Sequence, residues 1–234
     1  MKALAIRNIL TILAAGLILS GALWTQAAAQ SVEPNTIRGG LRLTEPVQTK
    51  NRASFRANEF HLDNGVTFVH EYTPQTQVVT VQAWIKTGSV NEDSQNNGIS
   101  HFLEHILFKG TKNYGPDEID ALVDARGGQM NAGTSKDYTM YYVTLPVADV
   151  DIAASVISDM VFNASFLPDE IEKEKPVVVQ EIQRKFDNPT YDMWREAAAV
   201  LYEGTPYAME IIGTADNVNA FTSEMLKKYY QSHY

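Results

Sequence analysis

The chain has 234 residues, 44% of them hydrophobic and 20% charged, which is typical of a folded protein with one large core rather than two full-sized domains. The formal net charge of −9 argues against nucleic acid as a partner, because phosphate binding requires a basic face. The sequence contains no cysteine, which excludes thiolate metal sites and cysteine nucleophiles.

Residues 1–29 have the pattern of a secretory signal peptide. Lys2 and Arg7 precede an apolar run from Ile9 to Trp24, and the small residues 27–29 follow it. We therefore expect a bacterial protein that is periplasmic or secreted, with no stable membrane span after cleavage. An uncleaved anchor is the alternative, although the apolar run is short for a membrane span.

The next segments predict an extended start and then β-structure. Residues 30–57 are polar without clear periodicity and are expected to form an extended N-terminal segment before a domain that covers 58–234. Alternating residues on both sides of Asp63-Asn64-Gly65 predict a β-hairpin. A further alternating run begins at residue 78 and places Trp84 on the face opposite to its apolar residues.

Helical patterns dominate the later part of the chain. Pro176 lies inside one predicted helix and is expected to kink or restart it. Strands that precede helices, with a hairpin among them, predict an α+β fold in which an antiparallel sheet packs against helices. The further elements expected are a helix that stops at Gly110, a helix from Pro116, two strands within 129–146, and helices at 147–163, 168–186, 191–202 and from about Thr222.

The stretch "SHFLEHILF" carries the first candidate site. His101 and His105 are one helical turn apart, so both imidazoles can reach one ion from the same helix face. Glu104 lies near that face, placed to take a proton from a metal-bound water rather than to share the ion. The pattern H-x-x-E-H is a signature of zinc peptidases. A purely structural role is the alternative, but burying two imidazoles and a carboxylate on an apolar helix is costly.

A catalytic zinc ion needs a third protein ligand, because three ligands plus water is the usual set. The predicted helix 168–186 offers four glutamates. Glu181 lies in its apolar part, whereas Glu170 and Glu172 lie in a charged stretch typical of a solvated face. Glu174 is two turns before Glu181 on the same face and is placed to accept a hydrogen bond from a ligand imidazole, which would fix its tautomer.

Several blocks together resemble one family. The stretches "NGVTFVHE", "VQAWIKTGSVNE", "GISHFLEHILFKGT", "GGQMNAGTSKDYTMYY" and "TPYAMEIIGT" occur in that family's order. The chain is similar to the inverted-zincin metallopeptidases, which include pitrilysin, insulysin and mitochondrial processing peptidase. In that family a glutamate ligand follows the H-x-x-E-H motif by about 75 residues, and here positions 106 to 180 separate His105 from Glu181. The resemblance covers about Phe60 to Tyr234.

The resemblance implies specific roles. His101, His105 and Glu181 would bind one zinc ion per chain, Glu104 would be the general base, and Glu174 would match a second acidic residue of the catalytic site. Asn131 and Ala132 would lie on an edge strand that pairs with an extended substrate, since a free edge offers main-chain hydrogen bonds to any peptide. The alternative for Asn131 is an ordinary turn residue beside Gly127-Gly128.

The C-terminus departs from the family pattern. The chain ends at Tyr234, where family members continue into further strands and a second, homologous domain. We therefore expect an incomplete family domain and a second domain or subunit as a partner. Two functions remain: a zinc endopeptidase acting on oligopeptides or unfolded polypeptides, and a non-catalytic or partner-dependent peptide-binding subunit of a two-chain peptidase.

Overall fold

The computed structural model describes residues 47–48 and 57–234. The expected signal peptide, 1–29, and nearly all of the expected extended segment, 30–57, lie outside the described residues. Among the described residues, no helix has both the length and the apolar character needed to cross a membrane.

Two antiparallel sheets form the β-structure of the described chain. One has the order β1-β2-β3, from Val47–Gln48, Ala57–His61 and Thr67–Glu71. Strands β2 and β3 form the hairpin predicted around Gly65, whose φ of 88° suits the turn. The other sheet has the order β4-β6-β5, from Val78–Ile85, Thr139–Pro146 and Gln129–Thr134. Strand β5 is therefore an edge strand of this sheet among the described residues.

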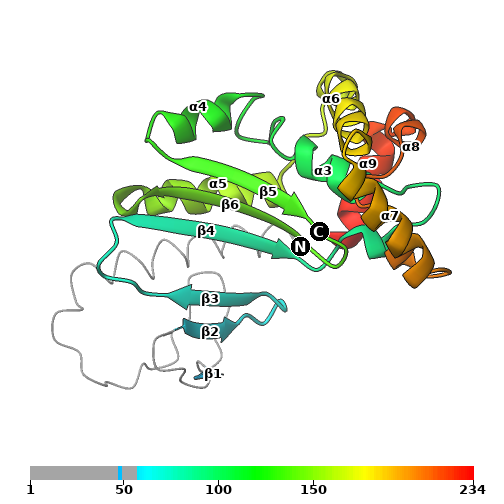
Figure 1. Cartoon of the computed structure of the whole chain (residues 1–234). Helices are drawn as coiled ribbons and strands as arrows, with labels where there is room; N and C mark the ends of the chain where they lie inside the picture. The colour runs from blue at the N-terminus through cyan, green and yellow to red at the C-terminus, as the bar shows by residue number, and fades with distance from the viewer. Residues whose placement is uncertain (1–46, 49–56) are drawn as a thin grey trace.

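Helices cover one face and one end of the β4-β6-β5 sheet. Helix α5, Val150–Phe162, packs against β4 and β6, while α3, Ile99–Ile106, lies beside the end of the sheet with α6, Pro168–Phe186 (Figure 1). This arrangement confirms the α+β prediction. The remaining helical elements are α4 (Glu118–Asp124), α7 (Pro189–Leu201), α8 (Ala215–Ala220), α9 (Ser223–His233), and the short 3-10 turns η1 (Ser89–Asn91), η2 (Val147–Asp149) and η3 (Pro206–Ala208).

Some element boundaries differ from the prediction. Helix α3 ends at Ile106 rather than at Gly110, because the chain turns through 107–109 before Gly110 adopts φ 122°. Helix α6 begins and ends as predicted and continues through Pro176, so the expected restart was wrong. The short helix α8 was not predicted, since its six residues carry too little apolar periodicity.

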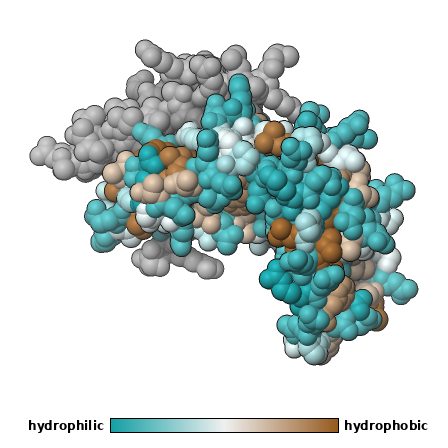
Figure 2. All heavy atoms as spheres, turned by 90° about the horizontal axis from the view of Figure 1, so that it is seen from above, coloured by the Kyte–Doolittle hydropathy of each residue, from teal (hydrophilic) through white to brown (hydrophobic). Residues whose placement is uncertain are grey.

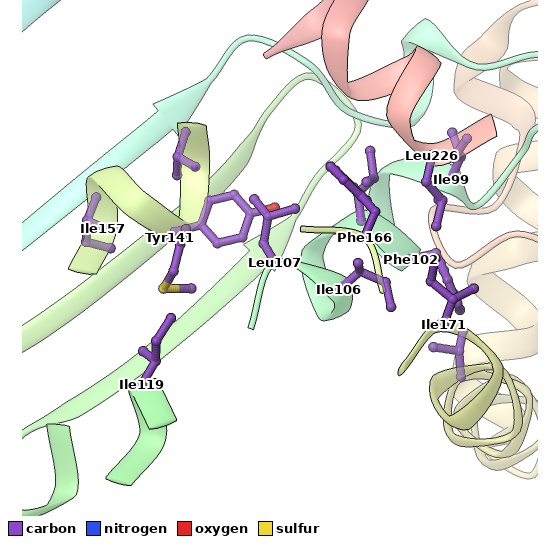
Figure 3. Packing of buried hydrophobic residues seen from close by; sticks show 14 of the residues in the cluster. Ile99, Phe102, Ile106, Leu107, Ile119, Tyr141, Ile157, Phe166, Ile171 and Leu226 are labelled. Carbon is purple, nitrogen blue, oxygen red and sulfur yellow. The ribbon is translucent and has the colours of Figure 1, made fainter. Parts of the chain in front are cut away.

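The hydrophobic core is continuous and surrounds α3. Ile99, Phe102, Leu103 and Ile106 are buried with the i, i+3, i+4, i+7 spacing of one helix face. Figure 3 shows this face meeting residues of the neighbouring helices, such as Ile171 of α6. Packing this face into the core turns the opposite face, with His101 and Glu104, toward a cavity.

Apolar residues on the surface are more scattered than those in the core. Apolar residues appear as separate patches within a mostly hydrophilic face (Figure 2). Helix α7 has no buried residue, and Trp194 on it is 65% exposed. This helix also lines the cavity beside α3.

Candidate metal centre

Two helices bring three candidate ligands together. Helix α3 carries His101 and His105, and α6 carries Glu181. One ligand atom from each residue lies within 4.8 Å of the others. The Nε2 atoms of both histidines lie 3.6 Å from Oε2 of Glu181. In the part of the chain that the structure describes, this is the one cluster of three such residues that could hold a metal ion.

The residues present fit zinc. Two imidazole nitrogens and one carboxylate oxygen are typical zinc ligands, and three protein ligands leave a fourth position open for water or substrate. Ligand atoms of a tetrahedral zinc ion, with bonds of about 2.0–2.1 Å, lie about 3.4 Å apart. The separation of 3.6 Å between each Nε2 and the Glu181 oxygen is close to that value.

Glu174 lies where it can fix the orientation of one imidazole. Its Oε1 is 2.8 Å from Nδ1 of His105, and its Oε2 is 3.1 Å from Nζ of Lys109. The hydrogen bond places the proton of neutral His105 on Nδ1 and leaves Nε2 free to face Glu181. His101 differs, since its Nδ1 is buried without a hydrogen-bond partner among the described residues.

The pKa values of the three candidate ligands show where the cluster stabilises a positive charge. Burial, and then the neighbouring His105, lower the pKa of His101 to about 4. Burial also disfavours protonation of His105, but the carboxylates of Glu174 and Glu181 outweigh it and raise its pKa to about 9. His105, followed by His101 and Lys185, lowers the pKa of Glu181 to about 2 against the effect of burial. The carboxylates thus stabilise a positive charge between the helices, which is where a metal cation would bind.

Glu104 lies on the same helix but outside the ligand cluster. Its Oε2 accepts a hydrogen bond of 2.5 Å from Oγ1 of Thr134 on β5. Burial raises the pKa of Glu104, and the Thr134 hydrogen bond opposes that increase. A carboxylate with a raised pKa is a better proton acceptor near neutral pH.

A cavity of about 370 Å³ adjoins the cluster. His101 and Glu104 line it from α3, Thr134 lines it from β5, and further lining residues come from α7 and from residues 210–211. A larger depression of about 530 Å³ lies on α9, away from these residues. The cavity beside α3 is lined by Lys136, Lys185, Tyr191, Trp194, Arg195, Ala198, Gly133, Glu210 and Ile211 in addition to the residues already named.

Asn131 and Ala132 lie within β5, opposite Tyr142 and Tyr141 of β6. The alternative that Asn131 is a turn residue is therefore wrong. Oδ1 of Asn131 accepts a hydrogen bond of 2.9 Å from the Ala132 N–H. Strand β5 continues to Thr134, whose hydroxyl contacts Glu104, so the edge strand leads directly to the cavity.

The structure separates the four glutamates of α6. Glu170 pairs with Lys173, and Glu172 pairs with Lys175 with its side chain 68% exposed. Neither belongs to the three-residue cluster. Sequence reasoning missed Thr134 and Glu92, a buried carboxylate that contacts the start of α3. Glu92 lies six residues before the N-cap Gly98, outside the positions where capping signals are read, so no local signal pointed to it.

Comparisons with known proteins identify the family and the fold. The model of the family described as insulinase (peptidase family M16) matches residues 67–215. The chain is 38% identical over 171 residues to the uncharacterized zinc protease YmxG of Bacillus subtilis, covering 73% of this chain and 42% of that protein. It therefore spans about two fifths of that relative.

Two crystal structures share the fold. A protease from Helicobacter pylori superposes with a TM-score of 0.72 and 30% identity, covering 76% of this chain and 44% of that one. The periplasmic protease PqqL from Escherichia coli superposes with a TM-score of 0.69 and 25% identity, covering 79% of this chain and 21% of that one. With a family model that matches more than half of its residues, the chain belongs to the insulinase family, peptidase family M16.

Proposed function

We propose that this protein is a zinc-dependent endopeptidase that hydrolyses oligopeptides or unfolded polypeptides. The observation that carries the proposal is the convergence of His101, His105 and Glu181 within 4.8 Å, beside a cavity that Glu104 lines. These three residues would hold one zinc ion. When bound, zinc lowers the pKa of water and polarises a carbonyl group.

The remaining steps belong to the chain's own residues. Glu104 accepts a proton from the attacking water and passes it to the leaving amine. Thr134 holds the carboxylate of Glu104 in place through its hydrogen bond. Glu174 keeps Nε2 of His105 directed toward Glu181. Asn131 and Ala132 offer the edge of β5 to an extended peptide, which aligns the substrate with the cavity.

The signal-like pattern of residues 1–29 and the similarity to a periplasmic protease support a location outside the cytoplasm of a bacterium. We propose that the mature protein acts in the periplasm or is secreted. Cell fractionation with detection of the mature N-terminus tests this, and a protein found with residues 1–29 intact in the cytoplasm would contradict it.

The experiment for the main proposal combines metal analysis with cleavage of a quenched peptide. We expect one zinc ion per chain and hydrolysis that a chelator abolishes and added zinc restores. Failure to bind zinc at that ratio would overturn the proposal.

One observation supports a second function. The relatives include a protein named as a subunit, the mitochondrial-processing peptidase subunit beta of Dictyostelium discoideum, to which the chain is 33% identical over 177 residues. A non-catalytic or partner-dependent peptide-binding subunit would bind zinc and an unfolded peptide without cleaving the peptide. Adding a candidate partner chain to the same assay distinguishes the two functions, because only the partner-dependent form gains hydrolysis.

A further inference from the structure

Glu92 is a buried carboxylate next to the helix that carries the candidate metal ligands. It is 6% exposed and lies in the loop that follows η1. Its Oε2 accepts hydrogen bonds from the Gly98 N–H at 2.8 Å and from Nδ2 of Asn97 at 2.9 Å. Its Oε1 accepts one from the Ser100 N–H at 2.8 Å. Burial of a carboxylate is costly without such partners, so these hydrogen bonds hold both the Glu92 side chain and the start of α3 in place.

Helix α3 needs a capping group from elsewhere in the chain. Its N-cap residue is Gly98, with φ 99° and no side chain to accept the first N–H groups. A Cβ atom at this position would lie 2.7 Å from the Ile212 oxygen and 2.9 Å from Cα of Gly213. A serine or aspartate cap is therefore excluded there by space. Glu92 supplies the acceptor instead, and its negative charge interacts favourably with the helix N-terminus.

The same carboxylate connects α3 to other residues that line the cavity. Nδ2 of Asn97 also donates a hydrogen bond of 2.7 Å to the Glu210 carbonyl. The Glu210 side chain accepts a hydrogen bond from the Tyr191 hydroxyl on α7, and both residues line the cavity. Through Asn97, Glu92 thus joins the start of α3 to residues that line the cavity from other elements.

We propose that Glu92 is a positioning residue for the metal centre, whose carboxylate sets the start of α3 and so holds His101 against Glu181. Glu92 accepts a hydrogen bond from the Ser100 N–H, and the residue that follows Ser100 is His101. A shift of the first turn of α3 therefore moves one imidazole relative to a ligand on another helix. The inference rests on the proposed metal site but concerns a residue that touches neither metal nor substrate.

The decisive variant is Glu92→Gln, which preserves shape. Both carboxylate oxygens accept hydrogen bonds, so the glutamine amide places an N–H₂ group against an N–H donor. We expect zinc affinity, measured by competition with a chelator, to fall by at least about threefold. The loss should be smaller than the roughly 10–100-fold loss caused by mutating a residue that contacts a metal ligand directly. We also expect the visible absorption of the cobalt-substituted protein to change.

Asp159→Asn is the matched control. Asp159 is a buried carboxylate on α5, 3% exposed, whose partners Thr111, Asn113 and Asn163 lie away from the start of α3. Both variants should lose thermal stability, but the control should keep wild-type zinc affinity and cobalt absorption at a temperature where all proteins are folded. Wild-type values of both quantities in folded Glu92→Gln would overturn the inference.

Asn97→Ala keeps the test valid if Glu92→Gln fails to fold. It removes one hydrogen bond to Glu92 and the bond to the Glu210 carbonyl, and should weaken zinc binding in the same direction. An unchanged zinc affinity in this variant would also overturn the inference. Failure of the wild-type protein to bind zinc would instead reject the proposed function, so the two failures are distinguishable.

Discussion

Glu104 lies on α3 and Glu174 lies on α6 in contact with α3, yet their surroundings prepare them for different tasks. Burial raises the pKa of Glu104, which has one hydroxyl donor, Thr134. Burial also opposes ionisation of Glu174, but His105 and Lys109 donate to it and bring its pKa below the ordinary value. Glu104 is thus suited to accept a proton, and Glu174 is suited to remain charged and orient an imidazole.

Glu104→Gln tests the proton acceptor. The amide cannot take a proton from water, so we expect kcat to fall by about 10²–10⁴-fold. Zinc content should stay at the wild-type value, because Glu104 lies outside the ligand cluster. Peptide hydrolysis and metal analysis on the same preparation check both points. Wild-type turnover by the metal-loaded variant would contradict the assignment.

Glu181→Ala tests the third ligand. We expect loss of zinc retention after gel filtration, because two histidines alone leave the ion with one protein ligand too few. Glu172→Ala on the same helix is the control, since its side chain is 68% exposed and pairs with Lys175. If the Glu181 variant keeps the metal content of this control, Glu181 is not a ligand.

Glu174→Ala tests the orientation of His105. It removes the acceptor of the His105 Nδ1 proton and should weaken zinc affinity by roughly 10–100-fold. Competition with a chelator measures the change. A smaller loss is expected for Glu174→Gln, whose amide oxygen can still accept from Nδ1. Equal affinities for wild type and Glu174→Ala would show that the contact has no role in metal binding.

At the scale of elements, the segment after α7 is held against the start of α3. Gly213 has φ 75°, and a Cβ there would lie 2.3 Å from the Asn97 oxygen and 2.6 Å from Cα of Gly98. Asn217 of α8 donates to the same Asn97 oxygen at 3.1 Å. Close approach of two backbones thus fixes the wall of the cavity relative to α3.

Gly213→Ala and Gly204→Ala form a matched pair, because both glycines have φ 75° but no atom lies within 4 Å of a Cβ at Gly204. Both variants carry the strain of an alanine in the left-handed region. Only Gly213→Ala also forces atoms together, so we expect it to lose roughly 1–3 kcal/mol more stability. Denaturant unfolding measures the difference, and equal losses would contradict the close approach.

At the scale of the whole molecule, the proposed ion would link two helices that are distant in sequence. Ligands on α3 and α6 make zinc binding a cross-link between parts of the core. An ion that binds the folded state alone stabilises it by about 2.7 kcal/mol at a concentration 100 times its Kd.

We therefore expect zinc removal to lower the Tm by roughly 5–10 °C, since 1 kcal/mol corresponds to about 2–4 °C for a protein of this size. Thermal unfolding with and without chelator measures the shift. The Tm of Glu181→Ala should hardly change when zinc is removed. If zinc raised the Tm of this variant as much as that of the wild type, the ion would bind elsewhere.

The sequence by itself determined features that depend on local periodicity or local turn chemistry. The hairpin around Gly65, the bounds of α6 and the placement of His101, Glu104 and His105 on one side of α3 follow from residues close together in the chain. The family and the α+β fold also followed, because several motifs occur in a fixed order and both are confirmed by comparison.

The tertiary structure decided which distant groups meet. Apolar neighbours and the family spacing already favoured Glu181, but only the packing of α6 on α3 brings its carboxylate to the histidines, while Glu170 and Glu172 pair with lysines. Tertiary packing also produces the contact of Thr134 with Glu104 and the contact of Glu92 with the start of α3. Local pattern specifies the face a residue occupies, whereas its partner depends on how complete elements pack around the core.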